Sequence, residues 1–410
     1  MSLDLARVRA EFPALSVTEG GRPRIYFDAP GGTQACRRAI DGMTRHLVEG
    51  TANSGGAFRT AVDTDALSDA AHAAMADLLG GDASEIAFGP NMTSLTLALS
   101  RALARGWSEG DELVVTRLDH DANVAPWLHV ARDCGMIVRW LDFDPESGCL
   151  RLDTLPGLLG PRTRLVAVGG ASNALGTVND VPAIVAAVRS AGDALVFVDG
   201  VQSVPHLATD VRALGCDFLA CSPYKFFGPH QGVLWGKAEH MAALEAYKLR
   251  PSPDLPAAVR LETGTPSYEG QAGTLGAVEH LAWIGDLSGA AGDRRSRIVA
   301  GFDAVAAHER ALGQRFLDGL ASLPRVRLFG PASMEGRVPT FSVTVDGVPA
   351  RAAAERLAAA NLFAWSGDFY AYEAVRRLGL AESGGLLRVG FCQYSTAGEV
   401  DRLLELLGEL

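Results

Sequence analysis

The stretch VDGVQSVPHLATDVRALGCDFLACSPYKFFGPHQGVLWGK, residues 198–237, decides the fold of this chain. It continues an apolar run, LVFVDG at 195–200, and contains a second one, FLACSP at 218–223. Continuous apolar runs of this length are typical of strands buried on both faces of a parallel sheet. A third run, VLWGK at 233–237, follows a Gly-Pro turn, and we expect it to add to the same sheet as an antiparallel strand.

Outward from this stretch, short β-branched runs alternate with helical patterns through the first two thirds of the chain. The further strands that this pattern predicts are IAF at 86–88, LVVTRL at 113–118, MIVRWLD at 136–142 and LVAVGGAS at 165–172. Helical patterns follow them at 92–103, around 122–134 and in VPAIVAAVRSAG at 181–192. This alternation predicts an α/β fold: a mostly parallel sheet with helices on both faces.

The last third of the chain has a different order of predicted helices and strands. Long Ala/Leu/Arg helices, at roughly 269–288 and 296–322, lead into short apolar runs and a closing helix, EVDRLLELL. We therefore predict a smaller α+β domain and divide the chain into three parts. These are an N-terminal segment (1–25) packing with the small domain, a large domain (26–265), and connecting helices with the small domain (266–410).

Composition argues against several classes of protein. The 410 residues include 48 acidic and 37 basic side chains, a net charge of −11, and no Lys/Arg-rich run suited to nucleic acid. No stretch approaches the roughly 18 apolar residues of a membrane span, and MSLDLARVRAEFPAL lacks the apolar core of a signal peptide. The six cysteines are scattered, without a CxxC pair, so we expect no metal site and a cytoplasmic protein.

Polar residues that directly follow the predicted strands are the candidates for chemistry, because ligands of such sheets bind at the carboxyl ends of the strands. They are Asn91, Asp119, His120, Asp121, Ser172, Asn173, Asp199, Gln202, Ser222, Tyr224 and Lys225. Pyridoxal phosphate needs a lysine for its imine, a carboxylate against the pyridine nitrogen, and donors for its phosphate, often at a helix N-terminus. Asp199, at the end of a buried strand, and Lys225, one βα unit later, fit these needs.

The same residues carry a family resemblance. The run at 198–237 resembles the core of the class V aminotransferase family, in its cysteine desulfurase-like branch. The resemblance continues in LDHDANVAPW, SNALGTVNDV, LETGTPSYEG and LLRVGFCQYSTAGEVDRLLELL, and it starts at YFDAPGGTQ, residues 26–34. It implies fold type I of the pyridoxal-phosphate-dependent transferases, with that cofactor and an amino acid substrate.

The resemblance implies a role for each matching residue. Lys225 matches the imine-forming lysine, Asp199 the partner of the pyridine nitrogen, and His120 the side chain stacked on the ring. The other implied cofactor contacts are Gln202 and Asn173 at the ring hydroxyl, and Asn91, the backbone of Met92, Ser222, Tyr224 and Thr265 at the phosphate.

Three of the remaining matches concern the partner subunit and the substrate. Thr265 resembles a residue through which one subunit contacts the phosphate bound in the other, and this resemblance implies a homodimer. Arg388 matches the arginine that grips the substrate carboxylate, a bidentate task suited to a guanidinium. Asn53 resembles a loop position on the substrate side. Tyr224 stands where the family usually has histidine, and its hydroxyl is still a candidate for the phosphate.

One segment departs from the family pattern. Desulfurases of this branch carry a nucleophilic cysteine in a loop written roughly R-T-G-H-H-C-A, and the matching residues here run from Trp365 to Ala371. Tyr370 replaces the cysteine, and both histidines are absent. A tyrosine cannot accept sulfur as a persulfide, so the loop argues against desulfurase activity and leaves Tyr370 as a substrate-shaping residue. Cys392 is the alternative thiol.

The sequence therefore predicts a pyridoxal-phosphate-dependent transferase or lyase that removes the Cα proton of an amino acid. Transamination and β-elimination both remain open. The alternatives are a desulfurase that uses another thiol and a non-catalytic cofactor-binding protein. Each residue alone also has a structural interpretation: Asp199 as a helix cap, His120 as a buried polar group, and Asn173 in a turn with Gly176.

Overall fold

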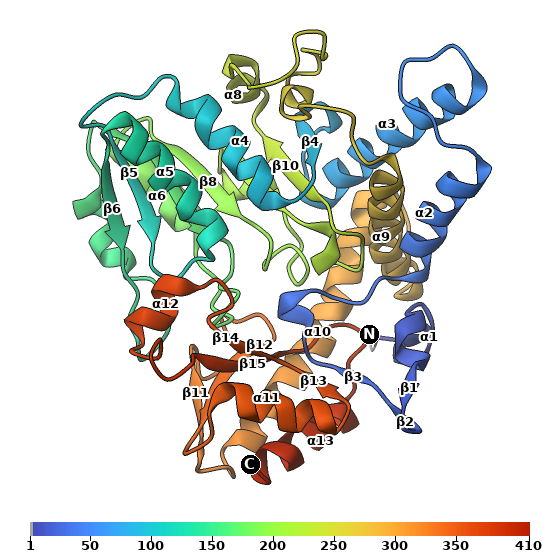
Figure 1. The fold of residues 1–410 in the computed structure, drawn as a ribbon, viewed down its shortest axis with the longest axis vertical. Coiled ribbons are helices and arrows are strands. Elements are labelled where there is room, and N and C mark those ends of the chain that lie inside the picture. The colour runs from blue at the N-terminus through green and yellow to red at the C-terminus, as the bar shows by residue number, and fades with distance from the viewer. Residues whose placement is uncertain (1–2) are drawn as a thin grey trace.

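A mostly parallel sheet forms the centre of the larger part of the molecule (Figure 1). The structure is a computed structural model that describes residues 3–410. The seven strands lie in the order β4-β10-β9-β8-β7-β5-β6. Their bounds are β4 (Ile86–Gly89), β5 (Glu112–Thr116), β6 (Ile137–Leu141), β7 (Thr163–Gly169), β8 (Leu195–Asp199), β9 (Phe218–Cys221) and β10 (Gly232–Gly236). The predicted fold class is confirmed, and β10 is the antiparallel strand expected from VLWGK, inserted between β4 and β9.

Helices cover both faces of this sheet, because alternate side chains of each strand point to opposite faces. In β8, Val196 and Val198 pack in one apolar cluster and Phe197 in another. The first cluster includes side chains of α3 (Arg59–Leu79), α6 (Val181–Ala191), α9 (Tyr268–Leu287) and α10 (Arg294–Leu320). The second includes side chains of α4 (Met92–Ala104) and α5 (Ala125–Cys134).

A smaller antiparallel sheet, in the order β11-β12-β15-β14, forms the lower part of Figure 1. Its strands are β11 (Val326–Phe329), β12 (Thr340–Val345), β14 (Trp365–Gly367) and β15 (Leu386–Gly390), and its helices are α11 (Ala350–Ala359), α12 (Tyr372–Arg377) and α13 (Ala397–Gly408). The N-terminal segment reaches this part through β3 (Ile25–Tyr26), which pairs with β13 (Leu362–Phe363). The proposed domain boundaries themselves stay a prediction.

Two long helices of the N-terminal third were not in the predicted set. α2 (Arg37–Glu49) and α3 lie beside α9, at the right of Figure 1. Glycine allows the close approach of α2 and α9, because a Cβ at Gly276 would lie 2.3 Å from the carbonyl oxygen of Arg38. Within residues 3–410, no helix is long and apolar enough to cross a lipid bilayer.

The remaining short elements connect these units. They are the helices α1 (Leu5–Ala10), α7 (Val211–Leu214) and α8 (Ala238–Ala243), and the hairpin of β1 (Thr18–Glu19) and β2 (Arg22–Pro23).

Candidate active site

Two adjoining cavities lie where the carboxyl ends of the parallel strands face the small domain. The inner cavity, of about 80 Å³, is lined by residues that follow β4, β5, β7, β8 and β9. The outer cavity, of about 840 Å³, adds residues of the loop from β14 to α12 and Arg388 of β15. His120, Asn173 and Lys225 line both. The strand-end residues singled out in the sequence therefore meet at one place.

Lys225 ends the 3-10 turn Pro223–Lys225 that follows β9, and its side chain is buried. Its Nζ donates a hydrogen bond to the carbonyl oxygen of Pro30. Burial, together with the positive charge of Arg388, lowers the pKa of Lys225 to about 7, although the carboxylate of Asp199 opposes the shift. Near neutral pH a substantial fraction of this amine is therefore unprotonated and nucleophilic.

Asp199 is the last residue of β8, and it lies in the lining of the inner cavity. Its Oδ1 accepts a hydrogen bond of 2.9 Å from the backbone N–H of Val201. Burial raises the pKa of Asp199 to about 6, while the Val201 bond and the charge of Lys225 act in the opposite direction. A protonated pyridine nitrogen in this cavity would be a further positive charge that stabilises the carboxylate.

His120 precedes a 3-10 turn, Asp121–Asn123, and its ring is fixed by that turn. Its Nδ1 accepts a hydrogen bond of 3.0 Å from the backbone N–H of Ala122. Burial, together with the positive charges of Lys225 and Arg388, lowers the pKa of His120 to about 4. The side chain is therefore a neutral imidazole in the lining of both cavities.

Asp119 lies beside His120 in the inner cavity, and the sequence interpretation gave it no role. Its carboxylate accepts hydrogen bonds from Asn123 Nδ2 at 2.7 Å and from the backbone N–H of Gly169 at 3.0 Å. Burial raises the pKa of Asp119 to about 7, and the nearby Asp199 adds to the effect. The signal in the sequence was its position at the end of the predicted strand 113–118, next to the histidine.

Two amide oxygens in the lining have no hydrogen-bond partner within the described chain. Asn173 donates from Nδ2 to the carbonyl oxygen of Phe369 at 2.9 Å, and Gln202 from Nε2 to Thr340 Oγ1 at 2.9 Å. Asn173 Oδ1 and Gln202 Oε1 are buried and unpartnered. A buried acceptor without a partner costs about 1–3 kcal/mol, so both oxygens fit a bound group that donates hydrogen bonds.

The N-terminus of α4 also lines the inner cavity. Asn91 caps the helix, since its Oδ1 accepts a 2.8 Å hydrogen bond from the backbone N–H of Ser94. Met92 and Thr93, the first two helical residues, lie in the same lining. The first backbone N–H groups of a helix have no partner within the helix, which favours an anion such as phosphate here. Thr93 was not among the predicted residues.

Arg388 lies on β15, where it is 4% exposed. Its Nη1 donates a 2.9 Å hydrogen bond to the carbonyl oxygen of Asn173, and its Nε has no partner. The guanidinium carbon lies 4.2 Å from the ring centroid of Phe369. Burial lowers the pKa of Arg388 to about 9, which still leaves it charged at neutral pH.

The loop that departs from the family pattern forms the outer wall. Phe369 and Tyr370 both have a φ of 57°, a left-handed conformation that is unfavourable for residues with a side chain. The backbone N–H of Asp121 donates to the Tyr370 carbonyl oxygen at 2.7 Å, and the Tyr370 and His120 ring centroids are 5.5 Å apart. These contacts hold the loop against the strand ends.

The other predicted residues divide into two groups. Ser222 and Tyr224 line the inner cavity, and the Tyr224 ring stacks on that of His230 at 4.7 Å between centroids. Asn53 and Thr265 are exposed and line neither cavity of the single chain. Cys392 lines neither cavity and is buried. The roles given to these residues stay predictions.

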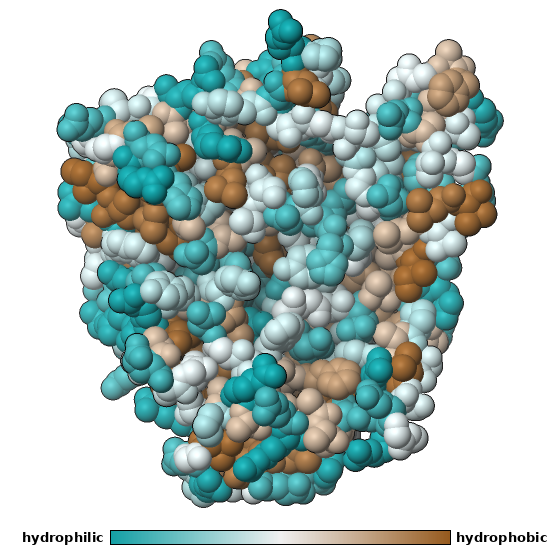
Figure 2. Space-filling model, in the orientation of Figure 1, coloured by the Kyte–Doolittle hydropathy of each residue, from teal (hydrophilic) through white to brown (hydrophobic). Residues whose placement is uncertain are grey.

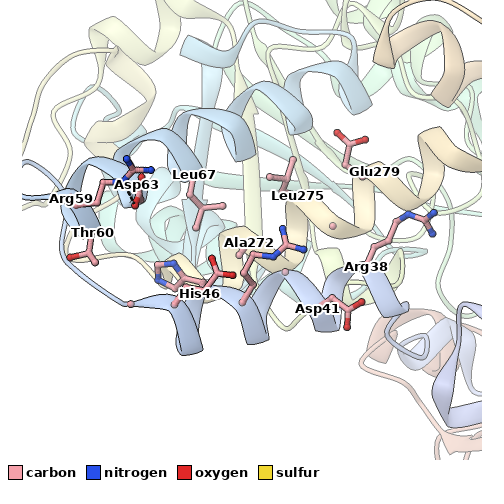
Figure 3. Close-up of a pocket in the computed structure, with 15 residues that line it drawn as sticks. Arg38, Asp41, His46, Arg59, Thr60, Asp63, Leu67, Ala272, Leu275 and Glu279 are labelled. Carbon is pink, nitrogen blue, oxygen red and sulfur yellow. Dashed lines mark hydrogen bonds and ion pairs between the residues drawn. The ribbon is translucent and has the colours of Figure 1, made fainter.

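A third cavity lies elsewhere, between α2, α3 and α9 (Figure 3). Its volume is about 580 Å³, and charged side chains such as Arg38, Arg45, Asp63 and Glu279 line it. It shares no residue with the two cavities around Lys225. We therefore leave it outside the candidate active site.

Comparison with known proteins identifies the class. The sequence profile described as Aminotransferase class-V matches residues 25–403. The "Aminotransferase-like protein FGM3" of Gibberella zeae is 33% identical over 98% of this chain and 97% of its own length. The "Probable cysteine desulfurase 2" of Mycobacterium leprae is 33% identical over 98% of this chain and 95% of its own length. The solved cysteine desulfurase CsdA of Escherichia coli superposes with a TM-score of 0.84 at 27% identity, covering 100% of this chain and 98% of CsdA.

The fold and the matches therefore define a fold type I enzyme of the pyridoxal-phosphate-dependent class. Within that class, the chain belongs to the class V aminotransferase family, and its relatives are cysteine desulfurase-like. The family resemblance predicted from the sequence is confirmed.

Proposed function

We propose that this enzyme acts on an α-amino acid and begins by removing its Cα proton. The observation that carries the proposal is the buried amine of Lys225, which shares one lining with Asp199 and His120 while Arg388 lies in the adjoining outer cavity. A nucleophilic lysine, a buried carboxylate and a carboxylate-binding arginine are the groups that this chemistry requires.

The lining fits pyridoxal phosphate, because it offers a partner for each polar part of that molecule. Lys225 would hold the aldehyde carbon, Asp199 the ring nitrogen, and the unpartnered oxygens of Asn173 and Gln202 would face the ring hydroxyl. The N-terminus of α4 and Ser222 would hold the phosphate, and Tyr224 is a further candidate there. When bound, the cofactor supplies a carbonyl that captures an amine and a ring that accepts electrons from Cα.

The residues of this chain would then bind the substrate and move its proton. Arg388 has a free Nε and is positively charged, so it can bind the α-carboxylate. Lys225 would serve as the base for this proton, since its pKa of about 7 suits proton transfer at neutral pH. His120, neutral and fixed through Nδ1, presents its ring to the cofactor site. Transamination and β-elimination share this first step.

Cysteine desulfuration is disfavoured, because the site offers no thiol. None of the residues that line the two cavities within residues 3–410 is a cysteine. Tyr370 occupies the position of the nucleophile, and Cys392 is 1% exposed, with burial raising its pKa far above the ordinary value. A neutral, buried thiol is a poor nucleophile.

The active unit that we propose is a homodimer in which Thr265 completes the phosphate site of the partner subunit. Thr265 is exposed in the single chain, and the apolar side chains of Leu47, Val48 and Phe58 on and between α2 and α3 are 57%, 78% and 60% exposed. Apolar surface also gathers at the right edge of Figure 2, over these helices. Exposed apolar groups of this kind mark an association surface.

Mixing two inactive variants tests the shared site. Lys225→Ala and Thr265→Ala chains, unfolded and refolded together, should regain one intact site per mixed dimer and recover high cofactor affinity there. Each variant refolded alone is the control. If the mixture behaves as the average of the two variants, Thr265 does not act on the partner subunit.

Deuterium exchange tests the proposed reaction independently of the product. In D₂O, the holoenzyme should exchange the Cα proton of its amino acid substrate for deuterium, so that the signal of this proton disappears from the NMR spectrum. The Lys225→Ala protein should leave the signal unchanged. The first substrate to examine is L-cysteine, followed by products: pyruvate indicates β-elimination, a keto acid with an acceptor indicates transamination, and alanine with sulfide indicates desulfuration. Exchange absent from every amino acid while the cofactor is bound would contradict the proposed removal of the Cα proton.

A further inference from the structure

The two ends of the outer cavity carry opposite charge. Among residues 3–410, Lys225 and Arg388 are the only lysine and arginine in its lining, and both lie where it meets the inner cavity. Asp121 and Asp368 are the only carboxylates that these residues contribute to it. Asp368 belongs to the loop that forms the outer wall, and Asp121 to the 3-10 turn that this loop contacts. A hydrogen bond joins the segments that carry these two carboxylates: the backbone N–H of Asp121 donates to the carbonyl oxygen of Tyr370 at 2.7 Å.

These two carboxylates have no cationic partner within the described residues. Neither Asp121 nor Asp368 forms an ion pair in the chain from residue 3 to 410, whereas the neighbouring Glu373 is paired with Arg117. In the described chain, the carboxylate of Asp368 accepts a single hydrogen bond, from the backbone N–H of Tyr370 at 3.0 Å. Burial and the charges of Glu373 and Asp368 raise the pKa of Asp121, while His129 has the opposite effect. The outer end is therefore a region of negative charge that no lysine or arginine of the described residues neutralises by an ion pair.

Aromatic faces lie beside the carboxylates. Trp365 and Tyr370 line the same cavity and are 53% and 72% exposed. Ammonium and guanidinium groups bind to such faces by cation–π attraction. The loop already pairs an aromatic ring with a guanidinium in this way, since Phe369 lies over Arg388.

Within residues 3–410, unpartnered buried atoms at the inner end of the same lining indicate where the backbone groups of an amino acid would bind. Arg388 Nε and Asn173 Oδ1 lack partners, and both residues are less than a tenth exposed. A carboxylate would satisfy Arg388, and an amino group or cofactor hydroxyl would satisfy Asn173. An α-amino acid held at this end directs its side chain toward the remaining volume, which far exceeds what the single sulfur of cysteine would fill.

We propose that the substrate is an amino acid whose side chain ends in a cationic group, held between Asp121 and Asp368 and against Trp365 and Tyr370. This inference rests on the proposed function, because it takes Arg388 as the site of the α-carboxylate. It assigns substrate selection to the loop that replaces the desulfurase cysteine.

A matched pair of ligands tests the charge directly. L-Citrulline has nearly the shape of L-arginine but a neutral end group. The two ligands therefore differ in the charge of the group that would lie between Asp121 and Asp368. The holoenzyme is titrated with each, and the change of the visible cofactor band gives the half-saturating concentration. We expect L-arginine to act at a concentration at least tenfold lower than L-citrulline, and rising NaCl to reduce that ratio.

Isosteric variants locate the effect. Asp121→Asn and Asp368→Asn keep the shape of the wall and the acceptor for Tyr370 while removing one charge each. Together they should bring the ratio of the two half-saturating concentrations close to one, chiefly by raising the concentration of L-arginine that is needed. Glu355→Gln, which removes an exposed carboxylate paired with Arg351 on α11, is the control and should keep the wild-type ratio.

The outcomes separate this inference from the proposed function. If citrulline and arginine act equally in the wild type, or if the Asn variants keep the preference, the cationic specificity is wrong while the amino acid reaction stands. If no amino acid alters the cofactor band, the proposed function fails and this inference fails with it. If the variants do not fold, the salt dependence of the wild-type ratio decides, because Asp368 is exposed and salt weakens the attraction of an exposed carboxylate for a cation.

Discussion

The two halves of the site differ in how closely they follow the family pattern. The strand-end half, with Asp199, Lys225 and His120, has the residues of the family motifs in one lining. The small-domain half keeps Arg388 but replaces the nucleophile loop with a wall that includes Phe369 and Tyr370. The difference teaches that the strand-end motifs and the small-domain loop are separate segments, and that the loop can depart from the family pattern while the strand-end motifs keep it.

The same contrast is visible in how the two halves are built. Strand-end groups are fixed by the sheet and by local bonds, such as those from Val201 to Asp199 and from Ala122 to His120. The loop has two consecutive left-handed residues, held by bonds from Asn173 and Asp121. A loop held by a few specific contacts can be rebuilt without disturbing the sheet.

Removing the lysine gives the largest expected effect. Lys225→Ala should abolish the visible band of the lysine-bound cofactor and all turnover, because no other amine lines the inner cavity in residues 3–410. Absorbance spectroscopy and a turnover assay measure the two effects, and circular dichroism with the sedimentation coefficient shows whether the fold is kept. An unchanged spectrum in a folded variant would show that the strand-end half has been misassigned.

Removing the arginine tests whether the part of the small-domain half that keeps the family pattern binds the substrate carboxylate. Arg388→Ala should lower kcat/KM for amino acids by roughly 30- to 4000-fold, the equivalent of about 2–5 kcal/mol for a buried charged partner. The cofactor band should remain, since Arg388 lines only the outer cavity. Equal turnover of the matching amines without a carboxylate by the wild-type enzyme would contradict this role.

The sequence predicted the sheet and the strand-end half because both depend on local patterns. Apolar runs define buried strands, and a polar residue directly after such a run, as at Asp199, lies at the ligand-binding edge. The outer wall was not predictable in the same way. That Phe369 lies over Arg388 depends on a left-handed conformation that non-glycine residues rarely adopt and on bonds to distant segments. Asp119 was a candidate without a role, because strand-end position alone does not assign one, and Thr93 was missed because it lies inside the first turn of α4.

The acidity of Lys225 predicts the pH dependence of cofactor binding. The pKa of Lys225 is lowered from 10.5 to about 7, first by burial and then by the charge of Arg388. Only the unprotonated amine attacks the cofactor, so the rate of its capture by the cofactor-free protein should rise about tenfold per pH unit below 7 and level off above about 8. An unshifted lysine would continue to rise toward pH 10.

Rapid mixing of the cofactor-free protein with pyridoxal phosphate between pH 5.5 and 9.5 measures this profile. A free lysine derivative under the same conditions corrects for the titration of the cofactor itself. The Arg388→Ala variant should move the inflection to higher pH, because it removes a positive charge that disfavours the ammonium form. A profile that does not move would show that Arg388 does not affect the pKa of Lys225. The two halves of the site would then be electrostatically independent.

The smallest expected effect separates the cap of α4 from its role at the phosphate. Asn91→Ala removes the 2.8 Å hydrogen bond to Ser94 and should lower the free energy of unfolding by about 0.5–2 kcal/mol. Asp293→Ala removes the corresponding 2.8 Å cap of α10, outside both cavities, and should cost a similar amount. Only the Asn91 variant should also weaken cofactor retention, measured by dialysis and absorbance, because only that helix N-terminus lines the inner cavity. Equal retention in both variants would mean that Asn91 serves the helix alone, leaving the phosphate to the backbone of Met92 and Thr93.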